Sequence, residues 1–142
     1  MIKGKASILI PAFENPNSLR SCLNSIRYAD LSDVGEVIVV DDCSKSKLNN
    51  IVTSFIFKIP NLSYVRNIEN LGMVKNWNKS LRISNCEYVS ILHHDDYLTK
   101  GSISKRVRHL MQNKECAMVG TKGALYRFSS KSPMVFFPNL AK

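Results

Sequence analysis

The sequence predicts an α/β fold, in which a Rossmann-like, mostly parallel sheet is flanked by helices. Short apolar runs alternate with amphipathic stretches along nearly the whole chain. Strands that alternate with helices are joined by right-handed crossovers, which makes neighbouring strands parallel. A chain of 142 residues with 44% hydrophobic residues is long enough for one domain with a sizeable core.

The first unit is a strand followed by a helix. Residues 6–10, "ASILI", form an apolar run that Pro11 is expected to stop. Asn15 suits the N-cap of a helix and Pro16 suits its first position. The helical period is carried by Leu19, Cys22, Leu23 and Ile26.

The second unit repeats this pattern. Residues 36–41, "EVIVVD", form a β-branched run that ends in acids. A helix is predicted after the polar "DCSKSKLNN" segment and should end before Pro60, with its apolar period carried by Ile51, Val52, Phe55 and Ile56.

Three further strands and two helices complete the pattern. We predict strands at residues 62–67, at 87–92 and at 116–120, the last from the run "CAMVG". A helix over residues 72–84 places Val74, Trp77 and Leu81 on one face. Another, over 101–113, places Ile103, Val107, Leu110 and Met111 on one face.

Polar residues follow four of the predicted strands, where open α/β sheets bind their ligands. These segments are residues 11–14, 41–42, 66–67 and 93–96. Two adjacent carboxylate pairs at one sheet edge raise each other's pKa unless a cation or hydrogen-bond donors compensate. A divalent cation would compensate well, whereas the alternative is that Asp42 and Asp96 only cap local turns or helices.

Other site chemistries are not indicated. Adjacent residues on an extended chain point to opposite faces, which argues against a zinc site made by His93 and His94. The four cysteines form no C-x-x-C pair and are expected to be reduced thiols. Neither of the common glycine-rich phosphate motifs is present, and the lone Gly72 also suits a helix N-cap.

Four blocks in order resemble the family 2 glycosyltransferases, inverting enzymes with a GT-A fold. The blocks are "ASILIPAFENPNSLRSCLNSI", "EVIVVDDCS", "NIENLGMVKNWNKSL" and "CEYVSILHHDDYLTKGSI", and the resemblance covers about residues 6–120. It implies that residues 1–142 form a single domain that binds a nucleotide-sugar donor. The sheet is then expected to be incomplete at the C-terminus, with the acceptor-binding half absent.

The resemblance also implies roles for individual residues. It places the nucleotide base at the ends of the first two strands, and it implies that Asp42 accepts a hydrogen bond from the base ring. The residues at these two strand ends are Pro11, Ala12, Phe13, Glu14, Asp41 and Asp42. Asn70 and Gly72 should lie near the donor, with Asn78 supporting their loop. The family's D-x-D motif falls on residues 93–95, where His93 replaces the first Asp. Asp95 is then the ligand of Mn²⁺ or Mg²⁺, and His94 and Asp96 lie beside it at the donor.

The implied function is transfer of a sugar, expected from a UDP-sugar, to a saccharide or lipid-linked acceptor in cell-surface polysaccharide synthesis. Such transfer needs a general base, and after Asp96 the only carboxylate is Glu115, which does not end a strand. We therefore identify no catalytic residue, and expect the chain to bind the donor without transferring the sugar. The resemblance does not specify the sugar, the acceptor or the nucleotide base of the donor.

The charge distribution leaves a second class of function open. Residues 97–142 have a net charge of +8, and residues 1–96 only +1. The alternative is therefore a non-catalytic nucleotide-binding or basic-surface module. A peripheral contact with an anionic membrane fits the basic third, whereas nucleic acid is not expected. A receiver-type phosphoacceptor domain is disfavoured because it needs its acidic pair after the first strand.

No signal peptide and no apolar run of about 18 residues is present, so a cytoplasmic location, including the inner face of the membrane, is expected. The segment 134–137, "MVFF", would need a covering surface.

Overall fold

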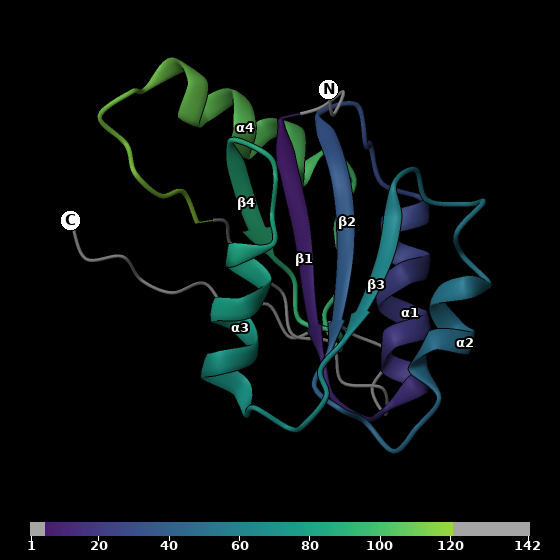
Figure 1. Ribbon diagram of the computed structural model, residues 1–142. Helices are drawn as coiled ribbons and strands as arrows, with labels where there is room; N and C mark the ends of the chain where they lie inside the picture. The colour runs from purple at the N-terminus through teal and green to yellow at the C-terminus, as the bar shows by residue number, and fades with distance from the viewer. Residues whose placement is uncertain (1–4, 121–142) are drawn as a thin grey trace, which may run out of the picture. The chain divides into compact units, whose positions relative to one another are not determined.

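A computed structural model describes residues 5–120 and confirms a parallel α/β architecture (Figure 1). The strands are β1 (Ala6–Ala12), β2 (Val34–Asp41), β3 (Leu62–Arg66) and β4 (Tyr88–Ile91). The helices are α1 (Pro16–Arg27), α2 (Leu48–Thr53), α3 (Met73–Arg82) and α4 (Ser102–Gln112). The described chain divides into two units after residue 108, and the first contains the whole described sheet.

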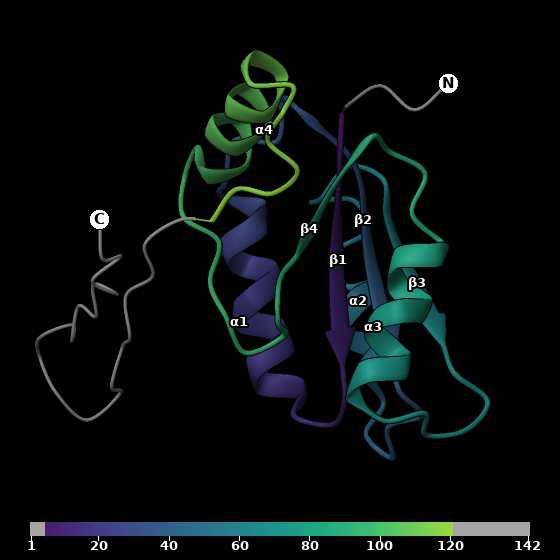
Figure 2. The same ribbon diagram turned by 90° about the vertical axis from the view of Figure 1, so that its left-hand side faces the viewer.

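The sheet has the order β3-β2-β1-β4, and all three strand pairs are parallel. The chain moves outward from β1 to β3 and then returns to the other side of β1 for β4. Because the crossovers are right-handed, this reversal places α1 on one face of the sheet and α3 on the opposite face (Figure 2). The strand order therefore switches between β1 and β4, and ligands bind at the carboxyl ends of such a pair.

The two central strands are buried along their whole length. One side of β1 and β2 packs against α1, α2 and α4 through a cluster that includes Ile8, Ile10, Val37, Val39 and Leu23. Burial on both faces explains why these strands are almost continuously apolar.

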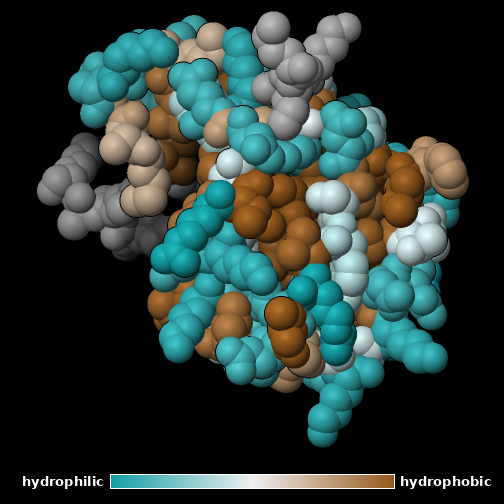
Figure 3. Space-filling model, in the orientation of Figure 1, coloured by the Kyte–Doolittle hydropathy of each residue, from teal (hydrophilic) through white to brown (hydrophobic). Residues whose placement is uncertain are grey.

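The α3 side has a smaller cluster, formed by Leu9, Ile38 and Val40 with the partly buried Val65 and Ile83. Figure 3 shows hydrophobic residues gathered on this side of the molecule.

β1 continues through Pro11, where the sequence predicted that it would stop. The Ala12 carbonyl accepts from the N–H of Asp42, which directly follows β2, so the preceding residue, Pro11, turns its nitrogen toward β4. The β1–β4 ladder ends at the pair Leu9–Ile91. No hydrogen bond is needed from the Pro11 nitrogen, and proline is tolerated there.

The start of α1 confirms its predicted cap. The Asn15 side chain accepts from Ser18 N–H at 3.3 Å, and Pro16 occupies the first turn. Arg27 lies in the last turn, where a cation complements the helix dipole.

α2 is shorter than predicted, because it ends at Thr53 rather than near Pro60. Ser54 N–H is shared between the carbonyls of Asn50 and Ile51, and Phe55 N–H bonds Val52. The chain thus tightens into turns of three residues. Phe55 and Ile59 are still buried in the core, which explains why the apolar period looked longer than the helix.

The predicted strand at residues 116–120 is wrong: between Gln112 and Gly120 the structure has a turn and no regular element. Cys116 N–H bonds the Asn113 carbonyl, and Met118 is 85% exposed. A strand requires a pairing partner, and an apolar run of five residues does not specify one. The basic and "MVFF" segments beyond residue 120 lie outside the described residues. None of the helices within residues 5–120 is long and apolar enough to cross a bilayer.

Candidate functional site

A cavity of about 350 Å³ lies where the carboxyl ends of β1, β2 and β4 meet the start of α3. It coincides with the switch in strand order, which is where a ligand site is expected. Its lining consists of Pro11, Ala12, Phe13, Asp42, Asn70, Gly72, Met73, Asn76, Trp77, His93 and His94.

Eight of these eleven residues were expected near the donor, and three were not. The three additional residues, Met73, Asn76 and Trp77, all belong to α3. Five expected residues are absent from the lining: Glu14, Asp41, Asn78, Asp95 and Asp96.

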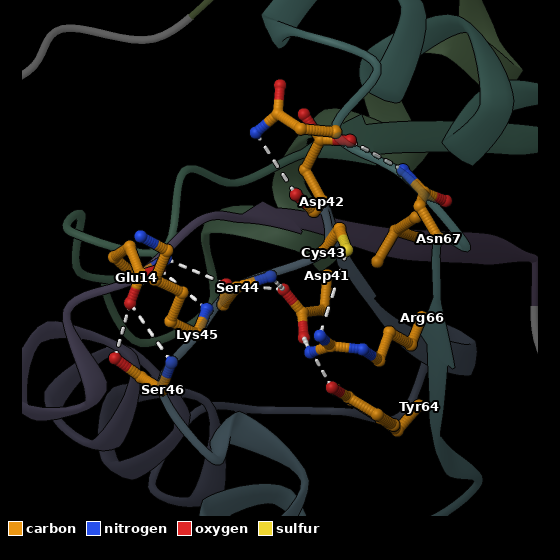
Figure 4. A network of polar contacts seen from close by, with 12 residues as sticks. Glu14, Asp41, Asp42, Cys43, Ser44, Lys45, Ser46, Tyr64, Arg66 and Asn67 are labelled. Atoms are coloured by element: carbon orange, nitrogen blue, oxygen red, sulfur yellow. Dashed lines mark hydrogen bonds and ion pairs between the residues drawn. The ribbon is translucent and has the colours of Figure 1, made fainter.

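Asp42 is buried and fixes the loop that forms one wall of the cavity. Its Oδ1 accepts from Asn67 Nδ2 at 2.7 Å (Figure 4). Oδ1 also accepts from Leu71 N–H at 2.8 Å, and Oδ2 accepts from Gly72 N–H at 2.9 Å. Asn70 Nδ2 also donates to the Asp42 carbonyl, at 3.2 Å. Asp42 therefore does not cap α2, the helix that follows it; it orders the backbone before α3 and borders the cavity.

Gly72 is the N-cap of α3, with φ 78°. This backbone conformation is unfavourable for residues with a Cβ, which explains why a glycine stands two positions after Asn70.

Asp41, although adjacent, has a different environment. It is fully buried and accepts from Ser44 N–H at 2.9 Å, from Arg66 Nη1 at 2.8 Å, and from the hydroxyls of Ser44 and Tyr64 (Figure 4). Burial, and then the bond to Asp41, raises the pKa of Tyr64 to about 12. Asp41 thus joins the end of β2 to β3 and to the loop before α2.

Glu14 is held by the same loop rather than by the cavity. Its carboxylate accepts from the hydroxyl and N–H of Ser46 and from Lys45 N–H at 2.6 Å. The Ser46 hydroxyl, and then the Lys45 N–H, lower the pKa of Glu14 below its usual range. In this structure Glu14 therefore connects the end of β1 to the β2–α2 loop.

α3 turns an unexpected face to the sheet. Its buried residues are Asn76 and Ser80, whereas Val74 and Leu81, on the apolar face expected from the sequence, are 65% and 42% exposed. Asn76 Nδ2 donates to the Val40 carbonyl at 3.1 Å, and Asn76 Oδ1 accepts from Asn67 Nδ2 at 2.9 Å. A helix next to strand ends must satisfy their polar groups, which the periodicity of apolar residues does not reveal.

His93 and His94 follow β4 and enter the cavity lining together. The His93 ring makes an edge-to-face contact with Trp77, with ring centroids 4.7 Å apart and planes at 84°. The His93 carbonyl accepts from Asp96 N–H at 3.0 Å and from Cys22 Sγ at 3.6 Å. Burial, followed by the charges of Asp96 and Asp95, raises the pKa of the Cys22 thiol to about 12.

Asp95 and Asp96 are exposed, in the turn that follows the cavity-lining histidines. Within residues 5–120 no three His, Cys, Asp or Glu residues are placed to hold a metal together. One exposed carboxylate beside a cavity nevertheless suits Mg²⁺ or Mn²⁺, which often keep waters and take substrate phosphates as further ligands. The residues present therefore fit a cation that arrives with a phosphate ligand.

A larger cavity, of about 450 Å³, is lined by the β2–α2 loop, the start of α2 and β3. In the part of the chain that the structure describes, its lining contains Lys45, Lys47 and Arg66 but no carboxylate. None of the residues predicted for the site lines it, and it does not touch the β1 or β4 ends. The smaller cavity is therefore the candidate site.

Comparison with known proteins gives consistent matches. The sequence profile of Glycosyl transferase family 2 matches residues 7–135. Glycosyltransferase GlyA of Streptococcus pneumoniae is 23% identical over 96% of this chain and 19% of its own length. The putative colanic acid biosynthesis glycosyl transferase WcaA of Escherichia coli is 29% identical over 75% of this chain and 38% of its own length.

Solved structures show the same fold. S. aureus TarS, solved alone and in complex with UDP and with UDP-GlcNAc, superposes with a TM-score of 0.70 for the unliganded form. It is 28% identical over 78% of this chain and 33% of its own. The mannosyltransferase PcManGT of Pyrobaculum calidifontis, solved with GDP-Man and Mn²⁺, has a TM-score of 0.68. It is 22% identical over 85% of this chain and 34% of its own. The chain spans less than half the length of these relatives.

Proposed function

The chain belongs to glycosyl transferase family 2 and has the GT-A fold, and on that premise we propose that its switch-point cavity binds the nucleoside diphosphate of a sugar donor, with a UDP-sugar as the expected ligand. The observation that carries this proposal is the convergence of Asp42, His93 and Phe13 on one cavity from three different strand ends. The chain would supply the donor-binding part of a glycosyltransferase, in line with its share of its relatives' length.

Asp42 would recognise the base. A carboxylate has about four acceptor positions, and Asn67, Leu71 and Gly72 use three of them. One acceptor position on Oδ2 is left, and Asp42 belongs to the cavity lining. A single ring N–H, as in uracil, matches one acceptor, whereas guanine presents an N–H and an amino group side by side. The TarS complexes with UDP and UDP-GlcNAc support the same preference.

Phe13 and Asn70 would hold the nucleoside in place. The Phe13 ring borders the cavity and is 48% exposed, so it offers a face on which a base can stack. The Asn70 amide is fixed by its bond to the Asp42 carbonyl, and its Oδ1 accepts from Gly72 N–H at 3.1 Å. Asn70 would therefore bind a ligand with little loss of conformational freedom.

The diphosphate would lie toward the end of β4. The histidines of the lining can donate hydrogen bonds to phosphate oxygens, and the exposed Asp95 can bind a cation. A bound Mg²⁺ or Mn²⁺ would stabilise the charge that develops on the leaving diphosphate. We thus propose that Asp95 binds the cation, either Mg²⁺ or Mn²⁺, and that Asp96 lies beside it at the donor.

We further propose that the acceptor is a saccharide or a lipid-linked saccharide of a cell-surface polysaccharide. WcaA, which is described as putatively acting in colanic acid biosynthesis, supports this acceptor class. Peripheral contact with an anionic membrane is proposed from the net charge of +8 in residues 97–142. Co-sedimentation with vesicles containing phosphatidylserine, at low and high salt, tests that contact.

The donor site is tested by thermal denaturation with uridine, UDP and GDP, each with Mn²⁺, with Mg²⁺ and with a chelator. A ligand at a hundredfold excess over its Kd stabilises the fold by about 2.7 kcal/mol. We expect UDP to raise the Tm more than GDP, and more with metal than without. The proposal is wrong if no nucleoside diphosphate shifts the Tm.

A further inference from the structure

We infer that Trp77 is a positioning residue of the donor site: its indole holds the imidazole of His93 where that ring meets the diphosphate of the nucleotide. This inference rests on the proposed function. Trp77 comes from α3 and His93 from the end of β4, and the two rings contact each other within the cavity lining.

The main chain and the side chain of His93 are fixed by different groups. The carbonyl of His93 is held by Asp96 N–H and Cys22 Sγ. Within residues 5–120 the imidazole itself has no hydrogen bond, and its recorded ring contact is the one with Trp77. An edge-to-face pair prefers a defined angle between the planes, so Trp77 sets the direction of the imidazole nitrogens and leaves them free for a ligand.

The cavity needs such a donor. Among residues 5–120, its lining contains no lysine or arginine, and Asp42 is the one carboxylate there. A diphosphate placed there must therefore be met by neutral donors or by a cation. The amides of Asn70 and Asn76 each already donate to a main-chain carbonyl. Within residues 5–120 this leaves the two imidazoles and the indole N–H of Trp77 as the side-chain donors of the lining that make no hydrogen bond.

Trp77 contributes to neither hydrophobic cluster of the sheet. It is partly exposed, on a helix that faces the sheet through Asn76 and Ser80. Removing the indole should therefore change phosphate binding more than it changes folding. That difference separates a positioning role from a structural one.

The test compares Trp77→Leu, Trp77→Phe, His93→Ala and the double variant Trp77→Leu/His93→Ala by calorimetric titration with uridine and UDP. Both ligands are used with saturating Mg²⁺ and with a chelator. Trp77→Leu should weaken UDP binding about three- to tenfold, the scale of one aromatic pair, and leave uridine binding within about twofold. Trp77→Phe keeps a ring at this position and should retain most of the UDP affinity.

The double variant should bind UDP no more weakly than His93→Ala alone, because Trp77 acts through His93. Trp77 is the only tryptophan in the sequence, so its fluorescence reports on this contact directly. UDP should change the emission more than uridine does, and His93→Ala should remove that difference.

Two results are distinguishable. If the unaltered protein binds no UDP, the proposed function is wrong and the inference is wrong with it. If it binds UDP, but Trp77→Leu leaves UDP binding unchanged or weakens uridine and UDP equally, the inference alone is wrong. Fully additive losses in the double variant would also overturn it.

Discussion

The pair Asp41/Asp42 and the pair Asp95/Asp96 look alike in the sequence but differ in the structure. The first pair is buried at the end of a central strand, and between them its two carboxylates accept seven hydrogen bonds. The second pair is exposed in a turn after β4, which has β1 as its one partner strand in the described sheet. Buried carboxylates need donors and become part of the scaffold, whereas exposed ones are available to a ligand.

The members of the buried pair also differ from each other. Adjacent strand residues point to opposite faces, so Asp41 joins the α1/α2 side and Asp42 joins the α3 side, where the cavity lies. Within one dipeptide, Asp41 mainly stabilises the fold and Asp42 both orders a loop and borders the site.

Asp41→Ala should have the largest effect on stability. It leaves the Tyr64 hydroxyl, the Ser44 hydroxyl and the Arg66 guanidinium without their acceptor, and should lower the free energy of unfolding by about 2–4 kcal/mol. Urea denaturation measures the change. Asp96→Ala is the matched control and should unfold at the same urea concentration as the unaltered protein. Equal destabilisation by both would contradict the comparison.

Asp42→Asn should affect both stability and binding. With the amide nitrogen in the place of Oδ2, the variant keeps the bonds from Asn67 and Leu71 but loses the acceptor for Gly72 N–H, at a cost of about 1–2 kcal/mol. It also loses the free acceptor at the cavity, so uridine and UDP should both bind at least about tenfold more weakly. Calorimetry at a temperature where the variant stays folded checks this. Unchanged uridine binding would show that Asp42 does not contact the base.

Asp95→Asn should change binding without changing stability. The free energy of unfolding and the affinity for uridine should stay as they are, because Asp95 is exposed. The extra stabilisation of the UDP complex by Mn²⁺ or Mg²⁺ should disappear. Thermal denaturation with UDP, with metal and with chelator, gives the readout. If the metal-dependent increment survives, Asp95 is not the ligand.

The smallest effect is expected from the pH dependence of stability. Burial by itself raises the pKa of Glu36, but the bonds from Ser7 and Asn85 outweigh it and lower the pKa below 4.5. A lowered folded-state pKa gives stability that is present above the unfolded pKa and lost as the pH falls through the folded one. Urea midpoints between about pH 6 and pH 3 should therefore decline, and Glu36→Gln should flatten the decline. If the urea midpoint of Glu36→Gln declines as steeply with falling pH as that of the unaltered protein, other carboxyl groups cause the decline.

Much of the fold was set by local sequence. The apolar runs of β1 and β2, the Asn15–Pro16 start of α1 and the Gly72 cap of α3 each act within a few residues. Such features depend on backbone conformation and side-chain periodicity, which a sequence displays directly. The polar residues that follow the predicted strands then indicated the edge of the sheet where the cavity lies.

The tertiary structure decided which of these residues share an environment. Glu14 and Asp41 form hydrogen bonds with residues up to 32 positions away, among them Ser46 and Arg66. The ring of Trp77 contacts that of His93, 16 positions further along the chain. The segment 116–120 has the composition of a strand but forms none, because pairing requires a partner that local preference cannot provide. Contacts of this kind depend on how loops close and on which buried donors need acceptors, and neither is encoded in a window of neighbouring residues.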